Sequence, residues 1–219
     1  MKKLVGALGW LVTGAGLGIG ALAGYTAWTL NGARRPWPPY TFSPFELGLP
    51  ATEVTFTARD GVQLAGWWLD NPDSGTVVIC CHGHRGNKAD MLGIGAGVHR
   101  GGHSVLLFDF RGNGESGDGP QSLAHHEQQD LSAALDWVRH QRPGARIGVV
   151  AFSMGASTAI LTAAGDPRIQ TLVLDSPFAT MSDVIAANYR RYRLPSEPLL
   201  PVADLVNRLR YGYTFALVK

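Results

Sequence analysis

Short apolar runs alternate with segments of helical character through the middle of the chain. Continuous runs of this kind are typical of strands buried on both faces of a parallel sheet. The intervening segments carry apolar residues at helical spacing, such as Leu131, Leu135 and Val138. The alternation predicts a doubly wound, mostly parallel three-layer α/β sheet with right-handed crossovers. The strand-like runs are 76–81, 104–108, 146–151 and 170–174, and the helical segments are 87–100, 125–141 and 154–165.

Two more strand-like segments precede these runs. Residues 53–57 and 62–69 flank the turn sequence Ala58-Arg59-Asp60-Gly61, which predicts an antiparallel hairpin at the edge of the sheet. With 219 residues, of which 45% are hydrophobic, the chain is long enough for one α/β domain and an appendage. We therefore expect one domain of about six strands over residues 51–219.

The N-terminal segment is uncharged from Leu4 to Leu30. About 20 apolar residues suffice for a helix to cross a bilayer. Residues 1–35 therefore predict a single-pass membrane anchor or a secretory signal that is cleaved near Ala23. Apolar character continues past that cleavage site through Tyr25 and Trp28, which favours the anchor. Basic residues flank the segment on both sides, so the sequence does not predict an orientation.

Residues 36–50 contain five prolines with interleaved aromatic residues. Such a composition disfavours regular helix or sheet, and it predicts an extended linker. The aromatic side chains lead us to expect that this linker lies against the following domain.

Several functional classes are excluded by composition. Four basic residues flank the first apolar segment and the rest of the chain carries a net charge of −2, so we expect no basic patch for nucleic acid. Cys80 and Cys81 are adjacent in an apolar run, which predicts two buried thiols and no disulfide framework. Residues 112–117 match the dinucleotide pattern G-x-G-x-x-G, but Pro120 follows where that motif needs a helix. No cofactor or metal site is predicted, and Asp109 and Arg111 are expected to pair and brace this turn.

The sequence Ala151-Phe152-Ser153-Met154-Gly155 lies between a predicted strand and a predicted helix. A sharp strand-to-helix turn exposes its central serine and requires small residues on either side, because the flanking backbones approach closely. The usual pattern has glycine where Ala151 stands. In a second interpretation Ser153 caps the helix by accepting hydrogen bonds from its first backbone amides.

Ligands of such sheets bind beyond the carboxyl ends of the strands, so the loops that follow other strands belong with Ser153. The glycine-rich sequence His82-Gly83-His84 follows one strand and could direct backbone amides at a developing oxyanion. Asp175-Ser176-Pro177-Phe178 follows the last predicted strand. A nucleophile on a tight turn and an amide-rich loop together favour acyl transfer.

These motifs, taken in this order, resemble the α/β-hydrolase family, in particular bacterial serine hydrolases tethered by an N-terminal helix. The resemblance implies that Ser153 is the nucleophile and that the amides of Met154 and His84 stabilise the oxyanion. It also implies a small-molecule acyl substrate: an ester, thioester or amide cleaved through an acyl-serine intermediate. Asp175 is a candidate for the acid of the catalytic triad, although a hydrogen bond to the turn that follows it explains this residue more simply.

The chain departs from the family pattern after residue 175. The family has about eight strands, with an acid after the seventh and a histidine after the eighth, whereas this chain continues with proline-punctuated segments and a helical run over 202–210. None of the seven histidines lies after Ser153, where the family has its catalytic histidine. Order alone excludes none of them as a base, but the sequence identifies no general base. We therefore expect a serine hydrolase domain that is truncated before its last two core strands, with residues 171–174 as an unpaired edge.

A second hypothesis is a catalytically silent, membrane-bound binding protein of the same fold. The sequence makes no prediction of the oligomeric state.

Overall fold

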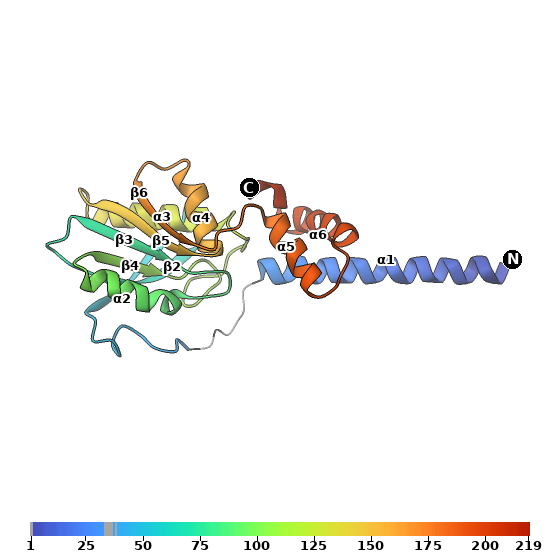
Figure 1. Ribbon diagram of the computed structural model, residues 1–219, viewed down its shortest axis with the longest axis horizontal. Helices are drawn as coiled ribbons and strands as arrows, with labels where there is room; N and C mark the ends of the chain where they lie inside the picture. The colour runs from blue at the N-terminus through green and yellow to red at the C-terminus, as the bar shows by residue number, and fades with distance from the viewer. Residues whose placement is uncertain (1, 33–36, 38) are drawn as a thin grey trace. The chain divides into compact units, whose positions relative to one another are not determined.

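The computed structural model describes residues 2–32, 37 and 39–219, with side chains from residue 14 onward except that of Ala15. Its contacts divide the chain into two units. Residues 33–178 form one unit, which contains the sheet (Figure 1). Residues 1–32 and 179–219 form the other, which is helical.

The sheet has six strands in the order β1-β2-β4-β3-β5-β6. β1 pairs antiparallel with β2 and β2 with β4, while the pairs β4-β3, β3-β5 and β5-β6 are parallel. The predicted hairpin and the mostly parallel sheet are therefore confirmed. The strands are β1 (Ala51–Thr57), β2 (Gln63–Leu69), β3 (Thr76–Cys81), β4 (Ser104–Phe108), β5 (Arg146–Phe152) and β6 (Ile169–Asp175).

Helices lie on both faces of this sheet. α3 (Glu127–Gln141) and α4 (Met154–Ala163) pack on one face, and α2 (Leu92–Arg100), preceded by the short 3-10 helix η1 (Lys88–Met91), lies on the other (Figure 1). The core beneath α2 includes Trp67, Leu92 and Leu107. Cys80 and Cys81 are buried free thiols, as predicted.

β6 forms one edge of the sheet. Among the described residues it pairs with β5 alone, and Val173 is 58% exposed. The prediction that this strand is buried on both faces is therefore wrong. Within the described residues α2 covers the sheet mainly at β4 and leaves Val173 of β6 uncovered. A shallow hollow of about 260 Å³ lies over the uncovered part of β3, β5 and β6 and is lined by Val78, Val150 and Val173 among others.

Part of the predicted linker contacts the sheet unit, as its aromatic residues led us to expect. Trp37 Nε1 donates a hydrogen bond to the carbonyl oxygen of Gly112 at 2.9 Å. The Tyr40 ring stacks edge-on against Trp67 at 5.1 Å between centroids. Residues 33–36 and 38 lie outside the described part of the chain.

The helical unit contains α1 (Lys2–Asn31), α5 (Met181–Arg191), α6 (Ser196–Tyr211) and the 3-10 helix η2 (Phe215–Leu217). α6 begins six residues earlier than the predicted run from residue 202, although the prolines suggested an irregular segment. Pro198 lies in the first helical turn, where the backbone N–H has no partner within the helix and proline is tolerated. Pro201 lies inside the helix and removes one backbone hydrogen bond there. We expected residues 179–219 to belong to the sheet domain; their contacts group them with α1.

A buried polar cluster joins α1 to α6 and to the chain that follows it. Asn31 Nδ2 donates to Asn207 Oδ1 at 2.8 Å, and Asn207 Nδ2 donates to the Tyr213 carbonyl oxygen at 2.7 Å. The Tyr213 hydroxyl donates to Asn31 Oδ1 at 2.9 Å, which closes the ring of contacts. Ala27 and Ala23 are fully buried one and two turns before Asn31, respectively. Small residues and a satisfied polar cluster thus define one seam.

The predicted transmembrane helix over residues 4–30 is not supported. Among the described residues, no helix is both long and apolar enough to span a membrane. Glycine and threonine, which contribute little to hydropathy, recur along the described part of α1. The side chains of residues 4–13 and 15 lie outside the described part of the chain.

We expect Asn207→Ala to loosen the helical unit selectively. The substitution leaves the Asn31 amide and the Tyr213 carbonyl without their partner in a buried site, which costs about 1–3 kcal/mol. Hydrogen exchange measured by mass spectrometry should show faster exchange in α1 and α6, while β5 serves as the internal control. Unchanged protection of α6 would contradict a structural role for the cluster.

Candidate active site

Ser153 occupies the strained turn between β5 and α4. Its backbone has φ 50° and ψ −115°, a conformation that residues other than glycine rarely adopt. The side chain is exposed and makes no capping hydrogen bond to α4. The interpretation of Ser153 as a helix cap is therefore wrong. The turn presents the hydroxyl at the carboxyl edge of the sheet, where a nucleophile elbow places its serine.

Gly155 explains why the turn is so tight. A Cβ atom at this position would lie 2.7 Å from the carbonyl oxygen of Cys81 and 2.6 Å from that of His82. Both atoms belong to backbone at the end of β3, which cannot yield as a flexible side chain would. Ala151 is completely buried, so the departure from glycine at that position is accommodated within the core.

We expect Gly155→Ala to destabilise the sheet unit by about 1–3 kcal/mol, because the added methyl group forces β3 and α4 apart. Thermal unfolding followed by circular dichroism measures this loss. Gly165→Ala is the matched control, since a Cβ atom there meets nothing within 4 Å. Equal stability of the two variants would show that the close approach is not obligatory.

His82 holds the loop after β3 with both ring nitrogens. Its Nε2 accepts a hydrogen bond from the Phe110 amide at 3.0 Å. Nδ1 must therefore carry the proton, and it donates to the Gly83 carbonyl oxygen at 2.7 Å. Burial lowers the pKa of this imidazole, although the negative charge of Asp109 acts in the opposite direction. The lowered pKa keeps the ring neutral. His82 thus orients the peptide between Gly83 and His84.

The structure brings this loop against the elbow. A Cβ atom on Gly83 would lie 3.4 Å from Ser153 Cβ, so the two turns are in contact. Met154 is the first residue of α4 and is buried, whereas His84 is half-buried in the loop. The oxyanion role of their backbone amides stays a prediction.

Asp175 lies at the end of β6, next to the elbow in the sheet. Its carbonyl oxygen accepts a hydrogen bond from the Ser153 amide at 2.9 Å. Its exposed carboxylate accepts one from the Ser176 hydroxyl at 2.6 Å. The side chain therefore stabilises the following turn, as the simpler interpretation predicted.

No histidine is placed as a general base within the described part of the chain. The Ser153 hydroxyl forms no hydrogen bond there with any of the seven histidines, and His82 uses both nitrogens on the backbone. His125 and His126 lie before α3, and burial lowers the pKa of both imidazoles. Nor do the described residues contain a cluster of three His, Cys, Asp or Glu side chains that could hold a metal ion.

A comparison with known protein families agrees with the elbow, the loop after β3 and the strand order. Residues 76–196 match the family described as alpha/beta hydrolase fold. The chain belongs to the α/β-hydrolase family. The family resemblance seen in the sequence is therefore confirmed.

Several curated proteins are similar in sequence to this α/β-hydrolase. The uncharacterized protein YqkD of Bacillus subtilis is 32% identical over 78% of this chain and 57% of its own length. The uncharacterized protein Rv2307c of Mycobacterium tuberculosis is 36% identical over 72% of this chain and 54% of its own. The chain thus spans about half the length of these curated relatives.

Among solved structures, the Pyrococcus furiosus esterase Pf2001 is similar to this α/β-hydrolase. It is 31% identical, with a TM-score of 0.67, and the match covers 80% of this chain and 68% of the esterase.

Two buried cations brace the loops of this α/β-hydrolase, and the sequence identified neither of their partnerships. Lys88 Nζ lies 2.9 Å from Asp109 Oδ2 and 2.5 Å from Glu115 Oε2. It also donates to the Tyr40 hydroxyl at 2.7 Å, and that hydroxyl donates to Asp109. Burial and the charge of Asp109 raise the pKa of Tyr40, so the phenol stays protonated. The linker is thereby fastened beside the loop after β3.

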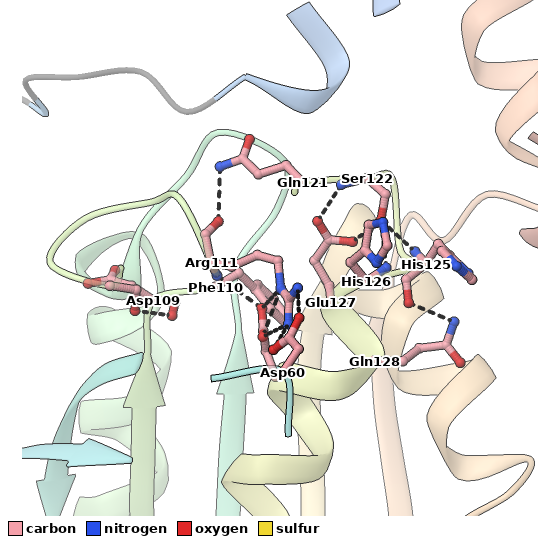
Figure 2. Close-up of polar contacts among 12 residues, drawn as sticks. Asp60, Asp109, Phe110, Arg111, Gln121, Ser122, His125, His126, Glu127 and Gln128 are labelled. Atoms are coloured by element: carbon pink, nitrogen blue, oxygen red, sulfur yellow. Dashed lines mark hydrogen bonds and ion pairs between the residues drawn. The ribbon is translucent and has the colours of Figure 1, made fainter. Parts of the chain in front are cut away.

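Arg111 is the second buried cation (Figure 2). Its guanidinium donates to Asp130 Oδ1 at 2.7 Å and to Asp60 Oδ2 at 2.6 Å. The prediction that Asp109 pairs with Arg111 is therefore wrong. Asp109 pairs with Lys88, and Arg111 pairs with Asp60 and Asp130. Burial opposes the charge on Arg111, but the two carboxylates outweigh it and raise its pKa.

Glu127 lies at the start of α3 beside this pair (Figure 2). Its carboxylate accepts hydrogen bonds from the Ser122 amide and hydroxyl, both at 2.8 Å. Burial nevertheless raises its pKa to about 7, and the hydrogen bonds from Ser122 offset this only in part. The carboxyl is thus a buried group that titrates near neutral pH.

We expect Glu127→Gln to change the pH dependence of stability. A raised pKa in the folded state favours the protonated carboxyl, so its stabilising contribution is complete below pH 4.5 and is lost as the pH rises through about 7. Between pH 4.5 and 8 the wild type should lose about 2–3 kcal/mol of unfolding free energy relative to the variant.

Urea denaturation across this pH range measures the difference. Glu53→Gln, which removes an exposed carboxyl from β1, is the matched control. A constant difference between wild type and Glu127→Gln would show that Glu127 does not titrate in this range.

Proposed function

We propose that the protein is a serine hydrolase that cleaves a small carboxylic ester, thioester or amide, with Ser153 as nucleophile. The observation that carries this proposal is the strained backbone and exposed side chain of Ser153 on a turn that Gly155 permits. Family membership supports hydrolysis, and the similar Pyrococcus furiosus protein is an esterase.

In this mechanism Ser153 Oγ forms a bond to the carbonyl carbon of the substrate. The carbonyl oxygen becomes an oxyanion, which the amides of Met154 and His84 stabilise. As the bond to the leaving group breaks, the proton from Oγ passes through a general base to that group. Water then attacks the acyl-serine, releases the acid and returns the proton to Ser153.

The second candidate is a catalytically silent binding protein of the same fold. One observation favours it: within the described residues no histidine forms a hydrogen bond with the Ser153 hydroxyl. A serine without a base is a poor nucleophile at neutral pH. The exposed Asp175 carboxylate, which binds Ser176, adds no base of its own.

Labelling with a fluorophosphonate probe distinguishes the two candidates. We expect the folded wild-type protein to form a covalent adduct, and Ser153→Ala to reduce labelling at least about 100-fold, because the reacting oxygen is gone. Ser132→Ala, on α3, is the matched serine control and should label as the wild type does. Folded protein that remains unlabelled would overturn the hydrolase proposal in favour of the silent protein.

We also propose that the N-terminal segment associates with a membrane surface; if the segment is cleaved near Ala23, the association precedes cleavage. The absence of charge from Leu4 to Leu30 supports this. So do the exposed rings of Tyr25 and Trp28, which suit a membrane interface.

A further inference from the structure

The two units differ in the sign of their charge. Residues 1–32 and 179–219 contain eight Lys or Arg and three Asp or Glu, a net charge of +5. Residues 33–178 contain eleven Lys or Arg and fourteen Asp or Glu, a net charge of −3. The net charge of +2 for the whole chain is thus the sum of a basic helical unit and an acidic sheet unit. The basic helical unit would be attracted to an anionic surface.

Arginines account for most of the basic charge in the C-terminal part of this unit. Arg190 and Arg191 lie in the last turn of α5, and Arg208 and Arg210 in the last turn of α6. A positive charge is stabilising at a helix C-terminus, which explains part of the placement of these arginines. All four are exposed, however, and none forms a salt bridge within the described part of the chain. The guanidinium groups of Arg190, Arg191 and Arg208 are thus available to external phosphates, whereas that of Arg210 lies over the Tyr211 ring, 5.4 Å from its centroid.

α1 and α6 expose large apolar side chains away from their buried seam. On α1, Leu17, Tyr25 and Trp28 are each 60% or more exposed, and their spacing places them on one face. On α6, Leu205 is 53% and Leu209 78% exposed, one turn apart. The buried seam of α6 consists of Leu199, Ala203 and Asn207, on another face of that helix. Exposed apolar groups combined with basic groups are typical of helices that lie in a membrane interface.

We propose that α1, α5 and α6 together bind the surface of an anionic lipid bilayer. The exposed leucines and aromatic rings enter the boundary of the headgroups, and the arginines contact lipid phosphates. This deepens the membrane association proposed above by assigning it to residues 179–219 as well as to the N-terminal segment. It does not depend on hydrolysis at Ser153.

Co-sedimentation of the full-length protein with vesicles tests the proposal. We expect binding to phosphatidylcholine vesicles that contain about 30% phosphatidylglycerol, and at least about 10-fold weaker binding to phosphatidylcholine alone. Raising the salt from about 50 mM to about 500 mM should weaken binding by a similar factor, since the attraction is screened.

Two variants probe the helical surface. Leu205→Ser with Leu209→Ser removes apolar contact, and Arg190→Gln with Arg208→Gln removes two charges that form no salt bridge; each should weaken binding about 10-fold. The matched control is Ile94→Ser with Ile160→Ser, which alters exposed residues on α2 and α4 of the other unit. Circular dichroism establishes that each variant is folded, and the arginine variant alone decides if the leucine variant unfolds.

The outcomes separate this proposal from its neighbours. If the variants bind both vesicle types as the wild type does, the N-terminal segment holds the protein by itself, and the proposal for α5 and α6 is overturned. Absence of wild-type binding to the anionic vesicles overturns membrane association altogether. Fluorophosphonate labelling of the same samples reports on hydrolysis independently, so failure of one proposal is not mistaken for failure of the other.

Discussion

The architecture around Ser153 depends on the contact between the backbone of Gly155 and the end of β3. Two carbonyl oxygens, of Cys81 and His82, occupy the space that a side chain would need. Because β5 and β3 are neighbours, this contact brings the turn after β5 against the loop after β3. His82 then sets the direction of that loop through the Phe110 amide, which belongs to the turn after β4. Because Gly155 has no side chain, the loops after β3, β4 and β5 can lie together at one edge of the sheet.

Buried charged groups also hold these loops in place. Lys88 and Arg111 are both buried, and each is matched by carboxylates from separate segments. Loops must satisfy their backbone polar groups, and ion pairs do so while fixing direction. Such pairs contribute little net stability, but loss of one partner leaves a buried charge and costs about 3–5 kcal/mol. Loss of a single partner of Lys88 or Arg111 is therefore expected to destabilise these loops.

The sequence predicted those features that leave a local pattern. Apolar runs marked the strands, and small residues around Ser153 marked the elbow, because both follow from neighbours in the chain. The partners of Arg111 did not, since Asp60 lies 51 residues before it and Asp130 19 residues after it. Lys88 was missed for the same reason: a lysine in a polar loop carries no sign that folding buries it. The grouping of α6 with α1 depends on contacts between opposite ends of the chain and left no periodicity to detect.

The hydrogen bond between Asn31 and Asn207 joins residues 176 positions apart. The sheet unit, by contrast, is one continuous stretch, so it can fold while the rest of the chain is still being made. At about 5–20 residues per second, the ribosome needs roughly 10–35 s to reach the partner of α1. During that interval the buried seam of α1 is open to solvent. α1 therefore stays unenclosed after the sheet unit is able to fold, and a chaperone or a lipid surface has that time to bind it.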